Sequence, residues 1–140
     1  YISVTGVQTC ALPILASLRG VGLSGQKASY ILDVARRMQD GSVTFEGIES
    51  LSNDAIIAEL TSIKGVGEWT AHMFLIFCMG REDVLATGDL GIRMGVKKNY
   101  DFEAVPTPQE VAMVAEAHQW HPYESIACHY LWRSLDNLPK

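Results

Sequence analysis

Two short motifs in this chain, one rich in glycine and one acidic, have residue types and spacing that could do chemistry. The first is G-V-G at Gly65 to Gly67, and the second is G-D-L-G-I-R at Gly88 to Arg93, one predicted helix later. Gly65 and Gly67 can adopt positive φ and let a ligand approach the backbone closely. A helix starting directly after them would offer free amides to an anion, so a nucleic-acid phosphate fits this loop. The alternative is an ordinary turn between helices, because a lone G-x-G is a weak signal.

Composition limits the kinds of protein that could use these motifs. The chain has 140 residues, of which 48% are apolar and 19% charged, which suits one domain with a hydrophobic core. The formal net charge of −5 argues against coating nucleic acid by bulk electrostatics, although a local site is compatible with it. The longest apolar run, Met73 to Met79, is too short to span a membrane and is typical of a buried helix.

The three cysteines are widely spaced and include no C-x-x-C pair. This spacing argues against a disulfide framework or an iron–sulfur cluster and favours reduced thiols in the cytoplasm. Cys78 lies in the longest apolar run and Cys128 in a helical pattern, and we predict that both are structural residues of the core.

The elements that must position the two motifs are helices joined by short loops. We find no strand pattern and predict an all-α helical bundle. Six helices are expected: Ser24 to Gln39, Ser52 or Asn53 to Thr61, Gly67 to Gly80, a short one after Gly88, Thr107 to Gln119, and a last one from His121–Pro122 to a point before Pro139. The fifth begins with a capping box of Thr107 and Glu110, with Pro108 at the first helical position.

Three motifs in order carry a resemblance to a known family. They are G-V-G-E-W-T-A at Gly65 to Ala71, G-D-L-G-I-R at Gly88 to Arg93, and W-H-P-Y-E-S-I-A at Trp120 to Ala127. Together they resemble the helix-hairpin-helix base-excision DNA glycosylases, specifically the 3-methyladenine DNA glycosylase II branch, over roughly Leu15 to Leu138. The resemblance implies a helical bundle containing a helix-hairpin-helix motif. It also implies hydrolytic removal of alkylated purines, such as 3-methyladenine, after the base is flipped out of the duplex.

The resemblance assigns the catalytic carboxylate to Asp89 and the damaged-base pocket to Trp69, Tyr123 and Met73. A fixed carboxylate would stabilise the oxocarbenium charge at the sugar or orient the attacking water, and electron-rich rings suit a cationic purine. Asp89 also suits a helix N-cap, and both roles can coexist. Trp69 stands where bifunctional members carry a lysine, so a monofunctional enzyme without a lyase step is expected. We predict that Tyr130 and Trp132 are core residues.

The resemblance places the DNA contact on the hairpin, at Lys64, Gly65, Val66, Gly67 and Thr70. It further implies a monovalent cation on three backbone carbonyls, those of Thr61, Ile63 and Val66, and otherwise no cofactor. The expected partner is double-stranded DNA with a damaged base and not a membrane. The protein is expected to be a monomer in the bacterial cytoplasm, associated with the nucleoid.

Other features of the chain depart from the family pattern or weaken a competing reading. His121 and Glu124 stand where the family commonly has arginines, which removes basic contacts near the DNA face, and Met73 replaces a frequent aromatic residue. The histidines lack the spacing of a zinc motif, so we expect solvated or core side chains at His72, His118, His121 and His129.

Residues 4–14, V-T-G-V-Q-T-C-A-L-P-I, look like the translation of a common sequencing adapter. We therefore expect residues 1–14 to be an artefactual leader, excluded from the fold, rather than part of a signal peptide or a strand. Residues 15–140 would then be a partial helix-hairpin-helix glycosylase domain that lacks upstream helices of the family and is an inactive fragment if those helices are essential.

Two other functions stay open at this point. A non-catalytic helix-hairpin-helix module would grip DNA with the same hairpin, but it would have no reason to place an acid and aromatic side chains nearby. A helical interaction protein would carry the motifs by chance, and the acidic net charge favours this slightly.

Overall fold

In the computed structural model, the residues described are 15–136, and all regular elements in this part of the chain are helical. The prediction of an all-α fold is therefore confirmed. The chain divides after Gly67 into two compact units. No described helix combines the length and the apolar character needed to cross a membrane. The predicted leader, residues 1–14, lies outside the described residues.

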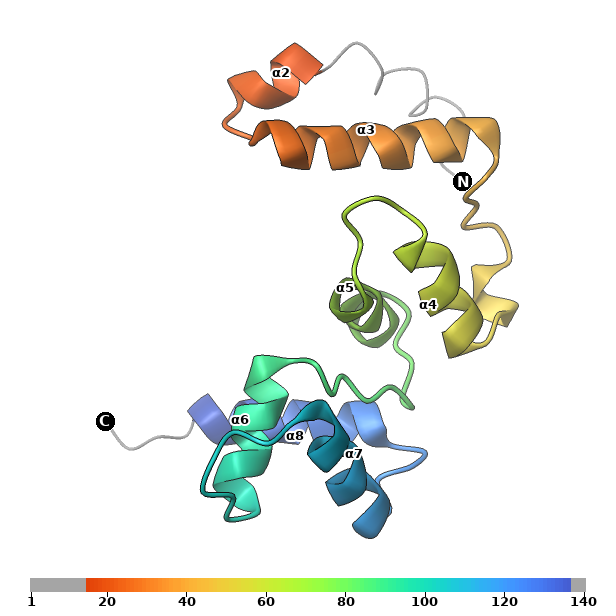
Figure 1. Ribbon diagram of the computed structural model, residues 1–140. Coiled ribbons are helices and arrows are strands. Elements are labelled where there is room, and N and C mark those ends of the chain that lie inside the picture. The colour runs from red at the N-terminus through yellow and green to blue at the C-terminus, as the bar shows by residue number, and fades with distance from the viewer. Residues whose placement is uncertain (1–14, 137–140) are drawn as a thin grey trace. The chain divides into compact units, whose positions relative to one another are not determined.

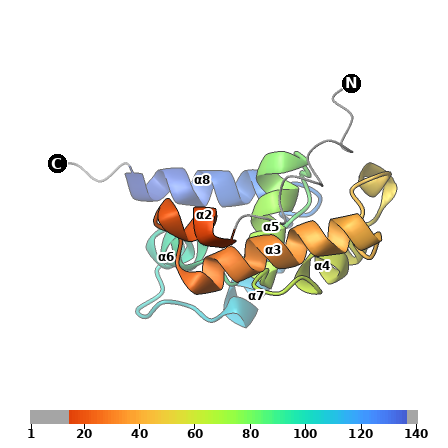
Figure 2. The ribbon, with the colours of Figure 1, turned by 90° about the horizontal axis from the view of Figure 1, so that it is seen from above.

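The first unit holds α2 (Leu15–Gly20), α3 (Gly25–Asp40), the short 3-10 helix η1 (Ile48–Ser50) and α4 (Asn53–Thr61). Helix α2 lies alongside α3 (Figures 1 and 2). Ser24 and Ser52 are the N-caps of α3 and α4, because their hydroxyls accept the amides of Lys27 and Ala55 at 3.3 and 3.2 Å. The predicted starts of both helices are confirmed, whereas α2 was not predicted. Among the residues of this unit whose burial is described, six apolar side chains are buried: Ala28, Val43, Ile48, Ile56, Leu60 and Ile63.

The second unit begins with α5 (Glu68–Met73), which continues into a π-helical turn, η2 (Phe74–Cys78). It then contains α6 (Leu90–Asn99), α7 (Pro108–Ala117) and α8 (Glu124–Asp136). Helix α6 packs against both α7 and α8 (Figure 1). Five buried side chains form the core between these three helices: Ile92, Val96, Val111, Cys128 and Leu131.

Helix α7 starts as its sequence predicts. The Thr107 hydroxyl accepts the Glu110 amide at 3.3 Å, and the Glu110 carboxylate accepts the Thr107 amide at 2.6 Å. Pro108 occupies the first helical position. The predicted capping box is therefore confirmed.

Three predictions about the second unit are wrong. Helix α8 begins at Glu124 rather than at His121, because residues 121–123 form a turn in which the Tyr123 amide donates to the Trp120 carbonyl at 2.6 Å. Tyr130 is 73% exposed rather than in the core, since the buried stripe of α8 consists of Ser125, Cys128 and Leu131. Cys78, at the end of the π-helical turn, is also exposed, while Cys128 is buried as predicted.

Candidate active site

Asp89 lies at the point where residues 79–89 enter α6, and its carboxylate accepts three well-aligned hydrogen bonds. Oδ1 accepts the Ile92 amide at 2.8 Å and the Trp132 indole N–H at 2.9 Å. Oδ2 accepts the Trp69 indole N–H at 2.7 Å. The bond from Ile92 makes Asp89 the N-cap of α6, which confirms that alternative. The two indole bonds are additional and are not needed to start a helix.

These contacts determine the charge of Asp89. Partial burial by itself raises the pKa of the carboxyl. The indole N–H groups of Trp132 and Trp69 and the amides of Ile92 and Gly91 act in the opposite direction, and together they hold the pKa of Asp89 below its ordinary value. Asp89 is therefore an anion at neutral pH. Because both of its oxygens already accept hydrogen bonds, it is better suited to stabilise positive charge than to abstract a proton.

The indole of Trp132 is itself held in place by aromatic neighbours. Phe77 stacks on it with ring centroids 5.7 Å apart and planes at 26°. His129 meets Trp132 edge-on at 5.6 Å and Phe77 edge-on at 5.4 Å. The π-helical turn that carries Phe77 and the helix that carries His129 thus fix the orientation of the indole N–H donor.

Gly91 in the first turn of α6 provides the space for this arrangement. A Cβ atom added at Gly91 would lie 2.9 Å from Cδ1 of Trp132 and 3.0 Å from Oδ1 of Asp89. Neither the indole nor the carboxylate could keep its position at that distance. A glycine is therefore required here for the two side chains to meet.

Trp69 is the one predicted pocket residue that the structure brings into contact with Asp89. Trp69 is 53% exposed, although its indole N–H is bound to Asp89. Tyr123, in the turn before α8, is 57% exposed, and Met73 is half-buried at the end of α5. Among the described residues, neither is in hydrogen-bond or ring contact with Asp89. Their assignment to a base pocket stays a prediction.

Sequence reasoning missed the role of Trp132. The residue packs against the core of the second unit, as predicted, but it also donates to a carboxylate 43 residues away in the sequence. A core tryptophan and a site tryptophan occupy a helix with the same periodicity. No signal in the sequence pattern therefore distinguishes them.

The hairpin loop, residues 62–67, follows α4 in the first unit. Gly65 has φ +89°, whereas Gly67 does not adopt positive φ. A Cβ atom at Gly65 would lie 2.2 Å from Cδ2 of Tyr30, so this glycine makes room for a ring of the protein itself. At Gly67 a Cβ atom would meet nothing within 4 Å. Of the two glycines that can adopt positive φ, Gly65 does so and Gly67 does not, and the close neighbour of Gly65 is Tyr30.

Asp33 on α3 anchors the hairpin loop. Its Oδ2 accepts the Lys64 amide at 3.2 Å and pairs with Nε of Arg37 at 2.9 Å. The bond from the Lys64 amide, together with Arg37, lowers the pKa of Asp33, so the anchor stays charged. The Val66 amide donates to the Ile63 carbonyl at 3.0 Å. Within residues 15–67, this leaves the amides of Gly65 and Gly67 for an external acceptor.

The carbonyls of Thr61, Ile63 and Val66 belong to the end of α4 and to the hairpin loop. Thr61 is the last residue of α4, so no further turn of that helix supplies a donor for its carbonyl. The Ile63 carbonyl accepts the Val66 amide and keeps a second lone pair. A set of carbonyl oxygens fits the chemistry of a hard cation.

His121 and Glu124, which stand where the family commonly has arginines, lie beside Asp83. Nδ1 of His121 is 2.9 Å from Oδ1 of Asp83. Burial of Glu124, followed by its hydrogen bond to Asp83 and the charge of Asp83, raises the pKa of Glu124 to about 7, while His121 opposes the shift. This part of the second unit is acidic or neutral where the family commonly has arginines.

The chain belongs to the HhH-GPD superfamily of base excision DNA repair proteins, whose family model matches residues 2–118. This confirms the family that the three motifs predict. DNA-3-methyladenine glycosylase 1 of Schizosaccharomyces pombe is 36% identical over 118 residues, covering 84% of this chain and 51% of that protein. The chain spans about half the length of the curated relatives it matches.

Solved structures similar to this chain include two glycosylases. One is the crystal structure of a DNA-3-methyladenine glycosidase from Bacillus halodurans, with a TM-score of 0.76 and 36% identity, covering 87% of this chain and 55% of that one. The other is the 3-methyladenine DNA glycosylase of Schizosaccharomyces pombe in complex with abasic DNA. It has a TM-score of 0.79 and 31% identity, covering 99% of this chain and 70% of that one.

Proposed function

We propose that this protein acts in base excision repair by hydrolysing the N-glycosidic bond of alkylated purines of the 3-methyladenine type. The observation that carries the proposal is the carboxylate of Asp89, which the indole N–H groups of Trp132 and of the exposed Trp69 hold ionised. Relatives that are named as DNA-3-methyladenine glycosylases support this substrate class.

The proposed hydrolysis follows from the negative charge of Asp89 and the exposed side chain of Trp69. An alkylated purine is a cationic leaving group, so its bond to the sugar breaks without a strong acid, and positive charge develops at the sugar as the base departs. The Asp89 anion stabilises that charge, and water completes the hydrolysis at the sugar carbon. The base has to leave the helical stack first, and the exposed face of Trp69 offers a stacking surface for it.

DNA contact is assigned to the hairpin loop of the first unit and to Thr70 in the second. The side chain of Lys64 is exposed, and the amides of Gly65 and Gly67 are available for a phosphate. Thr70 is exposed in the first turns of α5. A monovalent cation on the carbonyls of Thr61, Ile63 and Val66 would add positive charge toward a phosphate.

The same proposal covers the product, the DNA partner, the oligomeric state and the location of the enzyme. Trp69 replaces the lysine of bifunctional members, so the product is an abasic site and no Schiff base forms. The partner is double-stranded DNA with a damaged base. The protein works as a monomer in the bacterial cytoplasm, at the nucleoid.

The test is a base-release assay on methylated duplex DNA with the full-length protein and its Asp89→Asn variant. Asparagine is as good an N-cap as aspartate, so α6 keeps its start while the negative charge is lost. We expect base release to fall about 10²- to 10³-fold, the typical cost of removing one preorganised electrostatic group. Binding to abasic duplex DNA should stay unchanged.

Equal base release by the two proteins would remove Asp89 from the mechanism. DNA binding without base release by the unmodified protein would favour the non-catalytic binding module instead. A covalent DNA adduct after borohydride treatment would contradict the monofunctional assignment.

A further inference from the structure

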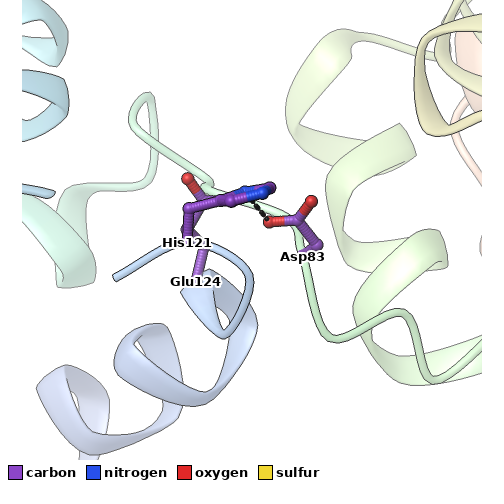
Figure 3. A group of neighbouring side chains, drawn as sticks. All are labelled: Asp83, His121 and Glu124. Atoms are coloured by element: carbon purple, nitrogen blue, oxygen red, sulfur yellow. Dashed lines mark hydrogen bonds and ion pairs between the residues drawn. The ribbon is translucent and has the colours of Figure 1, made fainter. Parts of the chain in front are cut away.

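Three side chains with metal-ligand chemistry meet in the second unit, outside the contacts of Asp89. They are Asp83 from residues 79–89, His121 from the turn before α8, and Glu124 from the first position of α8, and Figure 3 shows the three side chains close together. One oxygen of each carboxylate and one imidazole nitrogen all lie within 4.8 Å of one another. We call these residues the Asp83–His121–Glu124 cluster.

Backbone hydrogen bonds fix the position of this cluster independently of its own contacts. The Ser125 amide donates to the Glu82 carbonyl at 2.9 Å, and the Val84 amide donates to the Ser125 hydroxyl at 3.1 Å. Ser125 is 3% exposed, so water does not compete for these bonds. The residues on either side of Asp83 are thus tied to the residue that follows Glu124. These backbone bonds hold the two carboxyl groups close together, in addition to the hydrogen bond between Glu124 and Asp83.

The donor set indicates which ligand would suit this arrangement. Two carboxylates at close range repel each other, and a divalent cation between them would neutralise both. One imidazole nitrogen with two carboxylate oxygens is a mixed set that Zn²⁺ and neighbouring first-row metals accept, whereas Mg²⁺ and Ca²⁺ favour ligand sets made of oxygen. His121 and Glu124 also line an open groove of about 680 Å³, so an ion could reach the cluster from solvent.

We propose that Asp83, His121 and Glu124 bind one divalent transition-metal ion of the Zn²⁺ class. The ion joins residues 79–89 to residues 121–124, and it therefore stabilises the segment that ends at Asp89. The cluster supplies three protein ligands, so water completes the coordination of the ion, which serves to link the two segments. The proposal does not depend on glycosylase activity.

The test is metal binding by the full chain in a Cys78→Ser background, which removes the exposed thiol as a competing ligand. Co²⁺ is titrated with detection of its visible absorption, and Zn²⁺ is titrated by calorimetry. We expect one ion per chain and a higher melting temperature with Zn²⁺ present. His121→Gln and Glu124→Gln should each weaken binding by at least about tenfold, since replacing residues that merely support metal ligands already costs about 10- to 100-fold.

Glu116→Gln is the matched control, because Glu116 lines the same groove outside the cluster and carries the same change of charge. Its affinity for Zn²⁺ should equal that of the parent. His121 is exposed, so its replacement tests the cluster without threatening the core, and circular dichroism confirms the helical content of each variant. Unchanged Zn²⁺ affinity in His121→Gln, or equal binding of Mg²⁺ and Zn²⁺ by the parent, would overturn the proposal. The titrations contain no DNA, so their outcome is independent of the proposed base-release activity.

Discussion

At the scale of single residues, the indole N–H groups of Trp69 and Trp132 set the state of Asp89. Each donates to a different oxygen of the carboxylate, at 2.7 and 2.9 Å. Hydrogen bonds to a charged group are stronger than those between neutral groups, and they favour the ionised form. The anion that the proposed chemistry needs is therefore maintained by two tryptophans from different helices.

Trp132→Phe should keep an aromatic ring packed against Phe77 but remove the indole N–H that binds Asp89. We expect base release to fall about tenfold or more, because a hydrogen bond to a charged group contributes about 1.5–3 kcal/mol. The measurement is single-turnover base release on methylated duplex DNA. Trp120→Phe is the control, since Trp120 also packs against the core of the second unit. Equal losses in both variants would mean that core packing, and not the hydrogen bond, is responsible.

Sequence reasoning predicted Asp89 from its motif and Trp69 from its place beside the hairpin glycines. It could not predict that Trp132 reaches the same carboxylate. It also gave no reason to group Asp83 with His121, because these residues are 38 positions apart and match no metal motif. Contacts between distant residues depend on how helices pack, and local spacing does not encode that packing.

At the scale of elements, the start of α6 combines two features. Asp89 caps the helix with its carboxylate, and Gly91 in the first turn leaves room for Trp132. Local rules predicted this start well, as they did for α3, α4 and α7, because caps act through neighbouring residues. They failed for the start of α8, where a turn occupies residues 121–123. They also failed for α2, which the sequence pattern did not indicate.

Gly91→Ala should disturb the site more than the fold. Alanine favours the helix by about 1 kcal/mol over glycine, but its Cβ would displace the Trp132 ring or the Asp89 carboxylate. A displacement of that size can cost about 10²-fold in rate. Gly88→Ala in the same motif meets nothing within 4 Å and is the matched control. Base release and circular dichroism are measured for both, and full activity of Gly91→Ala would contradict the close packing.

The two hairpin glycines should respond differently to the same change. Gly65→Ala combines a positive φ with a clash against Tyr30, so we expect a loss of stability of about 1–3 kcal/mol in urea unfolding. Gly67→Ala has neither problem and should keep its stability, while its methyl group obstructs a phosphate and weakens DNA binding. Similar stability of the two variants would show that Tyr30 does not occupy the space beside Gly65.

At the scale of the whole molecule, an acidic chain is proposed to bind a polyanion. The net charge of −5 means that DNA contact has to come from a local site rather than from the overall field. The class of fold and the family were both predictable from the sequence, because helical periodicity and three ordered motifs extend over most of the chain.

Lys64→Ala should weaken DNA binding by a similar factor on damaged and undamaged duplexes. Loss of one phosphate contact should also reduce the slope of log Kd against log salt by about 1. Fluorescence anisotropy at several salt concentrations measures both quantities. Lys27→Ala, an exposed lysine on α3, serves as the control for net charge. Equal effects of the two variants would show that total charge, and not the hairpin, governs binding.

Asp89 is both the cap of α6 and the proposed catalytic anion, and this has a consequence for how the protein can change over generations. Selection for a well-formed helix and selection for repair act on the same carboxylate. A lineage that loses the chemistry can keep the helix by exchanging aspartate for asparagine. Loss of repair activity in such a descendant would therefore leave the fold almost unchanged. The only difference at the site would be an asparagine amide in place of the Asp89 carboxylate.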